Sequence, residues 1–145
     1  MAAPLDACFA AAAHVERWPS FLPHYRHVGF TNPADAPLTV LMKAYRDFGP
    51  IRYPIWWESE MEIDDERSCV RYRHIAGVTT GMDVEWRLAP RGGETHIVIV
   101  HEWTGPGWPL IGEFAARQVI CPRFVHVVAG RTLAGIKRSI ESEAA

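Results

Sequence analysis

The sequence predicts an α+β fold in which a curved antiparallel sheet wraps around one long C-terminal helix. Charged and apolar residues alternate over residues 52–64, which is the pattern of a strand with one buried face. Several neighbouring stretches repeat this period and are joined by short turns rich in Gly and Asp. Residues 122–143 instead space their apolar residues by three and four, as an amphipathic helix does.

Two short helices are expected before the sheet. Residues 5–14 are rich in Ala and predict a helix, and residues 16–22 predict a second short helix or turn that Pro23 closes. The period then changes to two, so residues 25–31 are expected to form the first strand. A second strand is expected at residues 38–46, after a turn-rich segment at 32–37.

The strand at 52–64 has the clearest alternation, with glutamates on its outer face. Its inner face is predicted to hold Tyr53, Ile55, Trp57, Ser59, Met61 and Ile63. Three more strands are expected near residues 70–74, 82–88 and 95–103. The larger side chains on their predicted inner faces are Val70, Tyr72, His74, Met82, Val84, Trp86, Leu88, Ile97, Ile99, His101 and Trp103.

The C-terminal helix needs a large apolar surface to lie against, because helix propensity alone does not hold it in water. Residues 110–120 predict a helical turn or two, and Pro122 is expected to start or kink the long helix. Its predicted apolar face consists of Val125, Ala129, Leu133, Ile136 and Ile140. Gly130 and Gly135 each cost about 1 kcal/mol relative to Ala. Close packing against a strand and room for a bound molecule are both open explanations for them.

Composition limits the classes of function. The 145 residues are expected to form one domain, 1–145, with its own core. A formal net charge of −2 and scattered basic residues argue against nucleic-acid binding. We expect no stable membrane insertion, since no apolar run is judged long enough to span a bilayer, and the start lacks a signal-peptide pattern. These features predict a cytoplasmic protein.

Cysteine and tryptophan usage adds two expectations. Cys8, Cys69 and Cys121 are widely spaced, with neither a CxxC pair nor His at ligand spacing, so we expect reduced thiols. No metal site and no cofactor are predicted. Six Trp residues exceed what so small a core usually needs, which indicates an aromatic-lined cavity.

Four segments carry a family resemblance, and they span most of the chain. They are Ala3-Pro4, VERWPSFLPHYRHV at 15–28, GMDVEWRL at 81–88 and HVVAGRTLAGIK at 126–137. With the order of elements, they resemble the START-like, or SRPBCC, superfamily over residues 3–143, and within it the polyketide cyclase/aromatase and coenzyme Q-binding groups. The resemblance implies a helix-grip fold. It specifies the reaction less well, because this fold hosts lipid carriers, hormone binders and cyclases alike.

Members of this superfamily begin with a strand just before the Ala-Pro pair, whereas only Met1 and Ala2 precede it here. The resemblance therefore implies that the native start lies upstream, or that this version lacks the strand. In the family that strand sits beside the last strand. Its absence would expose the backbone of residues 95–103 and favour association, including a homodimer.

The resemblance also implies site residues. Aromatase/cyclases line their pocket with Tyr, Trp and Ser side chains that look like Tyr25, Trp57, Ser59 and Trp86. They place an Arg two residues beyond that Ser, where this chain has Met61. The family's strongest catalytic assignment therefore does not transfer.

Candidate site residues follow from the resemblance together with the strand faces. Tyr25 and His101 are the candidate catalytic residues. The candidate substrate-binding residues are Trp57, Ser59, Met61, Tyr72, His74 and Trp86. A structural alternative stands beside each: a His on an apolar face is more often a hydrogen-bonded core residue, and Ser59 can pair with a water as well as with a ligand oxygen.

Two functions from different classes fit these residues. The first is binding of a small hydrophobic, aromatic polyketide-like molecule, with cyclase/aromatase activity in which Tyr25 and His101 move protons or polarise a carbonyl. Its partners would include polyketide synthase components. The alternative is a non-catalytic carrier of a quinone or lipid, which the missing Arg favours. A module for interaction with other subunits is a third reading of the same fold.

Overall fold

The computed structural model describes residues 1–32, 37–110 and 112–143, so most of the predicted turn at 32–37 lies outside the described residues. Six antiparallel strands form one sheet in chain order: β1 (Tyr25–Phe30), β2 (Leu38–Phe48), β3 (Ile51–Asp64), β4 (Cys69–Gly77), β5 (Asp83–Arg91) and β6 (Glu94–Glu102). The helical segments are α1 (Leu5–Ala13), a 3-10 turn (Val15–Arg17), α2 (Trp18–Phe21), α3 (Gly112–Ala115), a π-helical segment (Ala116–Val125) and α4 (His126–Glu143).

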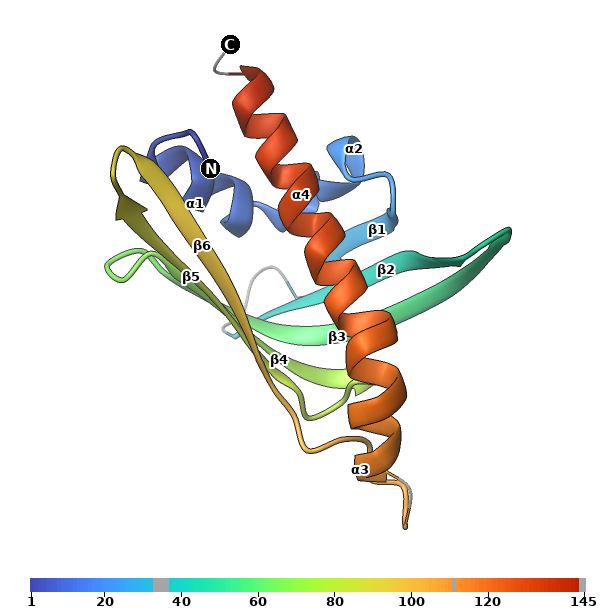
Figure 1. The fold of residues 1–145 in the computed structure, drawn as a ribbon. Helices are drawn as coiled ribbons and strands as arrows, with labels where there is room; N and C mark the ends of the chain where they lie inside the picture. Colours follow the sequence, from blue (N-terminus) through green and yellow to red (C-terminus); the bar gives the residue numbers. More distant parts are fainter. Residues whose placement is uncertain (33–36, 111, 144–145) are drawn as a thin grey trace.

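The predicted α+β fold is confirmed. The sheet is strongly curved, and α4 crosses its open side while α1 and α2 lie toward the C-terminal end of that helix (Figure 1). Helix α4 contacts α1 and α2 closely along its backbone, whereas it reaches the sheet mainly through side chains. The helix is therefore held at a distance from the strands, and the space between them is available for large side chains and a cavity.

A shift in register bends the long strands. Between Glu58 and Ser59, the pairing of β3 with β4 slips by one residue, which is the mark of a β-bulge. Gly77 ends β4 beside this bulge with φ +97°, and a Cβ there would lie 2.7 Å from the carbonyl oxygen of Trp56. Only Gly fits this position, which lets β3 and β4 curve toward α4.

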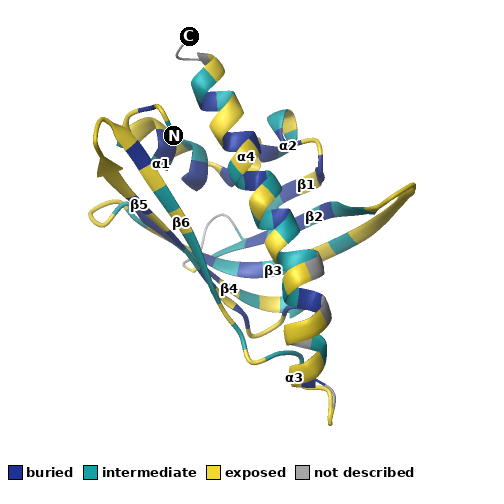
Figure 2. Ribbon diagram, in the orientation of Figure 1, coloured by how far each residue is buried: buried dark blue, intermediate teal, exposed yellow. Residues whose placement is uncertain are grey.

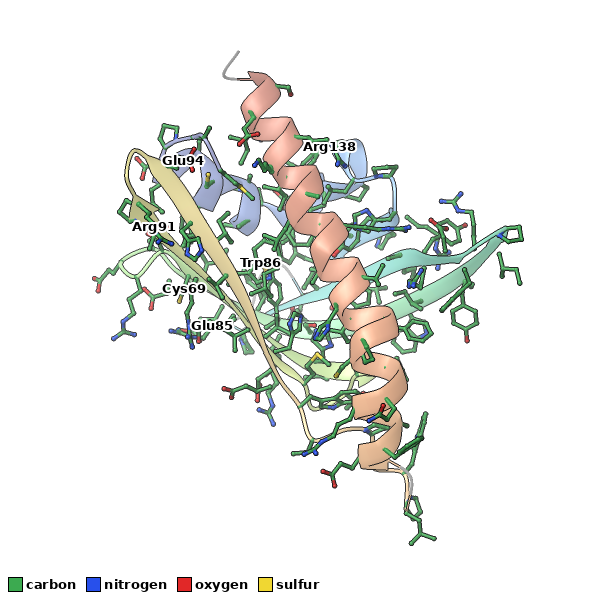
Figure 3. The ribbon with its side chains drawn as sticks, viewed as in Figure 1. Cys69, Glu85, Trp86, Arg91, Glu94 and Arg138 are labelled. Atoms are coloured by element: carbon green, nitrogen blue, oxygen red, sulfur yellow. The ribbon has the colours of Figure 1, made fainter. Side chains whose placement is uncertain are left out.

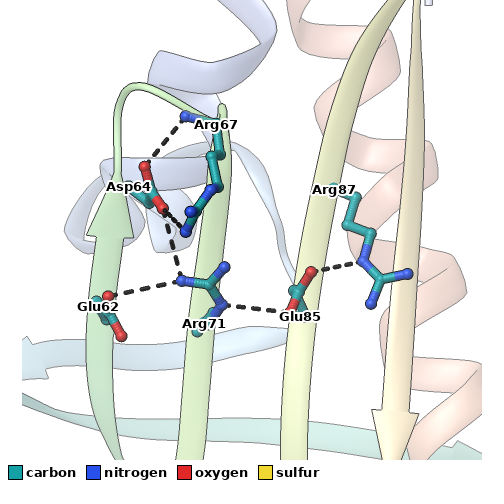
Figure 4. A network of polar contacts seen from close by, with 6 residues as sticks. All are labelled: Glu62, Asp64, Arg67, Arg71, Glu85 and Arg87. Atoms are coloured by element: carbon teal, nitrogen blue, oxygen red, sulfur yellow. Dashed lines mark hydrogen bonds and ion pairs between the residues drawn. The ribbon is translucent and has the colours of Figure 1, made fainter.

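The two faces of the sheet differ as the alternation predicted over most of its strands, but Tyr53 and Ile63, predicted on the inner face of β3, are exposed near the two ends of that strand. Buried and exposed residues alternate along much of β5, as the colour bands of its ribbon show (Figure 2). On the outer face Arg71 bridges three strands: its guanidinium lies 3.2 Å from Glu85, 3.6 Å from Glu62 and 3.7 Å from Asp64 (Figure 4). Surface pairs of this kind are worth about 0–1 kcal/mol each, so the network fixes the outer face more than it stabilises the fold.

The long helix begins earlier than predicted. Helical backbone starts at Gly112, and Pro122 lies inside a π-helical segment rather than at the start of the helix. In an α-helix Pro removes a hydrogen bond and clashes with the carbonyl four residues back. A π turn, which pairs residues five apart, has room for the ring, and regular α-helix resumes at His126.

The described helix from Gly112 to Ser142 is long and apolar enough, by length and composition, to cross a bilayer. This corrects the expectation that no apolar run has that length. The same properties are found in the central helix of a packed fold, and here α4 lies across the sheet and contacts α1 and α2.

Strand β6 is an edge of the sheet, and the first residues of the chain cover its beginning. The backbone N–H of Thr95 donates to the Met1 carbonyl oxygen at 2.9 Å, and the Met1 amino group donates to the Thr95 carbonyl oxygen at 2.8 Å. The Thr95 hydroxyl also donates to the Ala3 carbonyl oxygen at 2.8 Å. On the outer face of β6, Val98 is 40% exposed.

The two glycines of α4 have different surroundings. A Cβ on Gly135 would lie 2.1 Å from Cδ2 of Leu22, which is fully buried after α2, so this glycine permits close packing of the helix on the α2 segment and not on a strand. A Cβ on Gly130 would meet nothing within 4 Å. Neither position makes room for a bound molecule in this structure.

We predict opposite effects of Ala at these two positions. Gly130→Ala should raise the free energy of unfolding by about 1 kcal/mol, because it gains helix propensity at an open site. Gly135→Ala should lower it by about 1–3 kcal/mol, because Leu22 cannot move aside in a packed core. Urea titration of both variants measures the difference. Equal stabilisation by the two substitutions would contradict the packing described for Leu22.

Candidate functional site

A cavity of about 100 Å³ lies between the concave face of the sheet and α4. Its walls come from β1 to β6, from α2 and from the helix above them. Trp86 on β5 is buried between the sheet and α4 (Figure 3). The aromatic and polar residues of the lining are Trp18, Tyr25, Trp56, Trp57, Tyr72, His74, Thr79, Trp86, His101, Phe124 and Thr132.

The structure brings six of the eight predicted site residues together in this lining: Tyr25, Trp57, Tyr72, His74, Trp86 and His101. Ser59 and Met61 are buried, with 0% and 2% of their surface exposed, but they are not part of the lining. Both lie on the inward side of β3, opposite His74 and Tyr72 of β4. The cavity occupies only part of the concave face, and side-chain parity along a strand does not reveal which part.

Aromatic rings pack against one another around part of the cavity, tilted in the two Trp18 pairs and edge to face between Tyr25 and Trp57. The ring centroid of Trp18 lies 5.3 Å from that of Tyr25 and 5.6 Å from that of Trp86, while Tyr25 meets Trp57 at 6.1 Å. His74 stacks on Trp57, with centroids 6.1 Å apart and planes 15° from parallel. Such contacts hold large side chains in fixed orientations and give the cavity flat, rigid walls.

A hydrogen-bonded group connects β1 and α4 at the Tyr25 side of the cavity. The Thr132 hydroxyl lies 2.8 Å from the Val128 carbonyl oxygen, 3.1 Å from Nε2 of His24 and 3.3 Å from the Tyr25 phenol oxygen. At the preceding position of α4, Arg131 donates to the Asp47 carboxylate of β2 at 2.9 Å. These contacts fix the height of α4 above the sheet.

Burial and neighbouring charges control the protonation of the residues in this hydrogen-bonded group. Desolvation raises the pKa of Tyr25 far above its usual value, so the phenol stays protonated at neutral pH. Desolvation, with the charge of Arg131, lowers the pKa of His24 to about 4, against an opposing effect of Asp47. The Arg131 guanidinium in turn holds the pKa of Asp47 below its usual range.

Two further histidines line the cavity. Nδ1 of His74 is hydrogen-bonded to the Thr79 hydroxyl at 2.6 Å. His101 on β6 faces His126 of α4, with ring centroids 6.3 Å apart. Burial, reinforced by a neighbouring imidazole, lowers the pKa of His74 and of His101 to about 4. Both rings are therefore neutral at pH 7.

Two hydroxyls near the cavity have no hydrogen-bond partner among the described residues. They are Oη of Tyr72, which lines the cavity, and Oγ of Ser59, which does not. Burial also raises the pKa of Tyr72 well above its usual value. An unpaired buried hydroxyl costs free energy. The Tyr72 phenol oxygen is itself buried, so it would meet a ligand only after its surroundings shift.

The arrangement suits a neutral, flat molecule with a few oxygen atoms. Within the described lining there is no Lys, Arg, Asp or Glu, so no fixed charge faces the cavity. Hydrogen-bonding groups are limited to phenols, hydroxyls and neutral imidazoles. Among the described residues, no group of three His, Cys, Asp or Glu side chains is arranged to hold a metal ion.

Sequence reasoning missed several members of this site. Trp18 and Phe124 line the cavity but belong to helical segments and not to strands. Trp56 also lines it, although the alternation along β3 assigns this residue to the outer face. Thr132 and His24 were also missed. The signal for Thr132 was present, because its hydroxyl lies on the apolar side of the helix between Val128 and Ile136.

A protein family described as "Polyketide cyclase / dehydrase and lipid transport" matches residues 1–120. The chain belongs to this family. The resemblance noted in the sequence is thereby confirmed at the level of the family. Among curated protein sequences, none matches the chain.

Several solved structures have the same fold. The Zhui aromatase/cyclase from Streptomyces sp. R1128 superposes with a TM-score of 0.80 at 19% identity, covering 99% of this chain and 90% of the other. TTHA0849 from Thermus thermophilus gives 0.76 at 18% identity, covering 100% and 94%. The di-domain ARO/CYC StfQ from the steffimycin biosynthetic pathway gives 0.75 at 17% identity, covering 99% of this chain and 48% of StfQ.

The low pKa values of His24, His74 and His101 predict a loss of stability in mild acid. An unfolded His takes up a proton near pH 6.5, whereas these buried rings do so only near pH 4. The stabilising effect of the neutral rings is therefore complete above pH 6.5 and declines as the pH falls from about 6.5 to about 4. This difference in pKa is worth about 3 kcal/mol for a fully buried ring. Solvent screening reduces it for these partly exposed rings, so we expect the free energy of unfolding to fall over this range by on the order of 1 kcal/mol per histidine.

Denaturant titration at pH 7 and at pH 4.5 measures this loss. His101→Gln should reduce the difference between the two pH values, because it removes one of the titrating rings. His14→Gln, at a position with 60% of the side chain exposed, serves as the matched control and should leave the difference unchanged. A wild-type stability that is flat between these pH values would contradict the burial of the three rings.

Proposed function

We propose that this protein binds a small, flat, hydrophobic molecule of the aromatic polyketide type between the sheet and α4, and that it catalyses cyclisation or aromatisation of that molecule. The observation that supports this most directly is the cavity lining: aromatic walls that also carry uncharged oxygen and nitrogen groups. Membership of the polyketide cyclase/dehydrase family supports the same reading.

The size of the cavity limits what it holds. Its volume of about 100 Å³ is smaller than the roughly 300–1,000 Å³ of common ligand pockets. We infer that the enclosed space takes the one or two rings being formed, while the remainder of a longer chain extends past the rim at Trp56, which is 50% exposed. Trp57, Trp86 and Tyr72 would hold the faces of these rings.

His101 and Tyr25 are the proposed catalytic residues. In an aldol cyclisation, a proton leaves a carbon between two carbonyls, that carbon bonds to a second carbonyl carbon, and the new oxygen takes up a proton. Loss of water then gives the aromatic ring. His101 is neutral at pH 7 and is able to take the first proton and return it to the new hydroxyl. The Tyr25 phenol would form a hydrogen bond with an oxygen of the reacting molecule. His74 would be a further polar residue in the wall of the cavity.

A non-catalytic carrier of a quinone or lipid is the second candidate. One observation favours it: the described lining offers no cation to stabilise an enolate, and Met61 stands where the resemblance places the family's Arg. A pKa of about 4 also makes His101 a weak base. In a carrier, the same aromatic walls would serve only to bury the ligand.

Location and macromolecular partners follow as further parts of this proposal. A cytoplasmic protein that acts on polyketide chains would meet polyketide synthase components. The edge of β6, with Val98 exposed, supports a homodimer through strand pairing. Ser59 and Met61 would support the ligand-binding walls from beneath, since both are buried outside the lining.

Turnover of a linear poly-β-ketone separates the two candidates. We expect the wild-type protein to accelerate formation of the aromatic product, followed by absorbance and by the mass of the water lost. The Tyr25→Phe, His101→Ala double variant should be slower by about 100-fold or more, because it lacks the proposed base and the phenol that holds a reacting oxygen. Tyr45→Phe, a phenol of β2 outside the lining, is the matched control.

Cyclisation by the double variant at the wild-type rate would contradict the catalytic proposal. If instead neither protein accelerates the reaction and both bind a quinone with equal affinity, the carrier is the correct function. Circular dichroism of the double variant establishes that it is folded before either conclusion is drawn.

A further inference from the structure

The Thr132 hydroxyl has three hydrogen-bond partners but only one proton to donate. The partners are the Val128 carbonyl oxygen at 2.8 Å, Nε2 of His24 at 3.1 Å and Oη of Tyr25 at 3.3 Å. A carbonyl oxygen only accepts. The Thr132 proton is therefore directed to Val128, and this back-bond to the carbonyl one turn earlier is also its shortest contact.

This assignment determines the direction of the other two hydrogen bonds. The Thr132 oxygen has two lone pairs, which are filled when His24 donates its Nε2–H and Tyr25 donates its phenol proton. No other arrangement satisfies all three contacts at once. Tyr25 is 6% exposed and His24 is 7% exposed, so water does not readily take the place of either contact.

The phenol proton of Tyr25 is thus directed at α4 and away from a ligand. We infer that Tyr25 acts toward the ligand as a hydrogen-bond acceptor, and that the cavity therefore selects molecules with an enol or phenol hydroxyl over ketones and ethers of the same shape. This inference rests on the proposed function, since it concerns the ligand of the same cavity. It assigns to Thr132 and His24 a positioning role, exerted through Tyr25.

The chemistry of the ligand oxygen decides whether Tyr25 finds a partner. A hydroxyl on the ligand is able to donate to the Tyr25 oxygen. A ketone or ether oxygen only accepts, and leaves the Tyr25 lone pair without a partner. Tyr72 lines the same cavity, but its Oη is itself buried away from the open space, so it takes no part in this selection.

A pair of matched probes tests the inference: 2-naphthol, which has a hydroxyl, and 2-methoxynaphthalene, which only accepts. Isothermal titration calorimetry measures the ratio of their dissociation constants. We expect the wild-type protein to prefer 2-naphthol by about three- to tenfold, the range of one net hydrogen bond. Tyr25→Phe should remove most of this preference, and Tyr45→Phe should leave it unchanged.

Thr132→Val is the decisive variant, because it keeps the volume of the side chain and frees the Tyr25 proton to turn toward the cavity. The ratio should fall to about one, with tighter binding of 2-methoxynaphthalene than in the wild type. Thr132→Ser keeps the hydroxyl and should retain the wild-type preference, which guards against a general disturbance of the fold. A purely structural role of Thr132 would weaken both probes alike.

Two results overturn the inference in distinguishable ways. Binding of both probes with equal affinity in the wild type, or with a ratio that Thr132→Val does not change, would show that Tyr25 is not an acceptor while leaving the proposed function intact. Failure of both probes to bind would remove the proposed aromatic ligand, and the inference with it.

Discussion

The placement of α4 above the curved sheet is the constraint on which the rest of the structure depends. The helix meets α1 and α2 closely, with Gly135 against Leu22, but it stands away from the strands. Its height is fixed by the hydrogen bond between Tyr25 of β1 and Thr132 and by the ion pair of Arg131 with Asp47 on β2. The cavity exists because these contacts hold the helix without collapsing it onto the sheet.

The same contacts set the polarity of the cavity. Burying Tyr25, His74 and His101 without a charged partner keeps all three neutral at pH 7, in accord with the cost of burying an uncompensated charge. A cavity of this kind distinguishes ligands by shape and by hydrogen-bond direction. Any chemistry it performs must rely on positioning and on proton transfer, since fixed charge contributes little to stabilising an intermediate.

Much of the fold could be predicted because strands impose a period of two. Parity alone brought Trp57, Tyr72, Trp86 and His101 to the concave face, where the cavity lies. The alternation does not reveal where along a strand the cavity lies. It therefore could not show that Ser59, which faces inward, is outside the lining. Contacts between segments far apart in the sequence could not be predicted either. His24 and Thr132, for example, are hydrogen-bonded although they are 108 residues apart. The π-helical segment around Pro122 was missed because the pattern allowed either a start or a kink.

Native mass spectrometry of the purified protein, followed by extraction of any retained molecule, tests the central claim most directly. The claim is that the space under α4 holds one flat aromatic ligand with a hydroxyl group. We predict a one-to-one complex, either with a retained phenolic aromatic molecule or, for an empty protein, with added 2-naphthol. A retained acyl lipid, or an empty protein that forms no complex with 2-naphthol, would contradict the account.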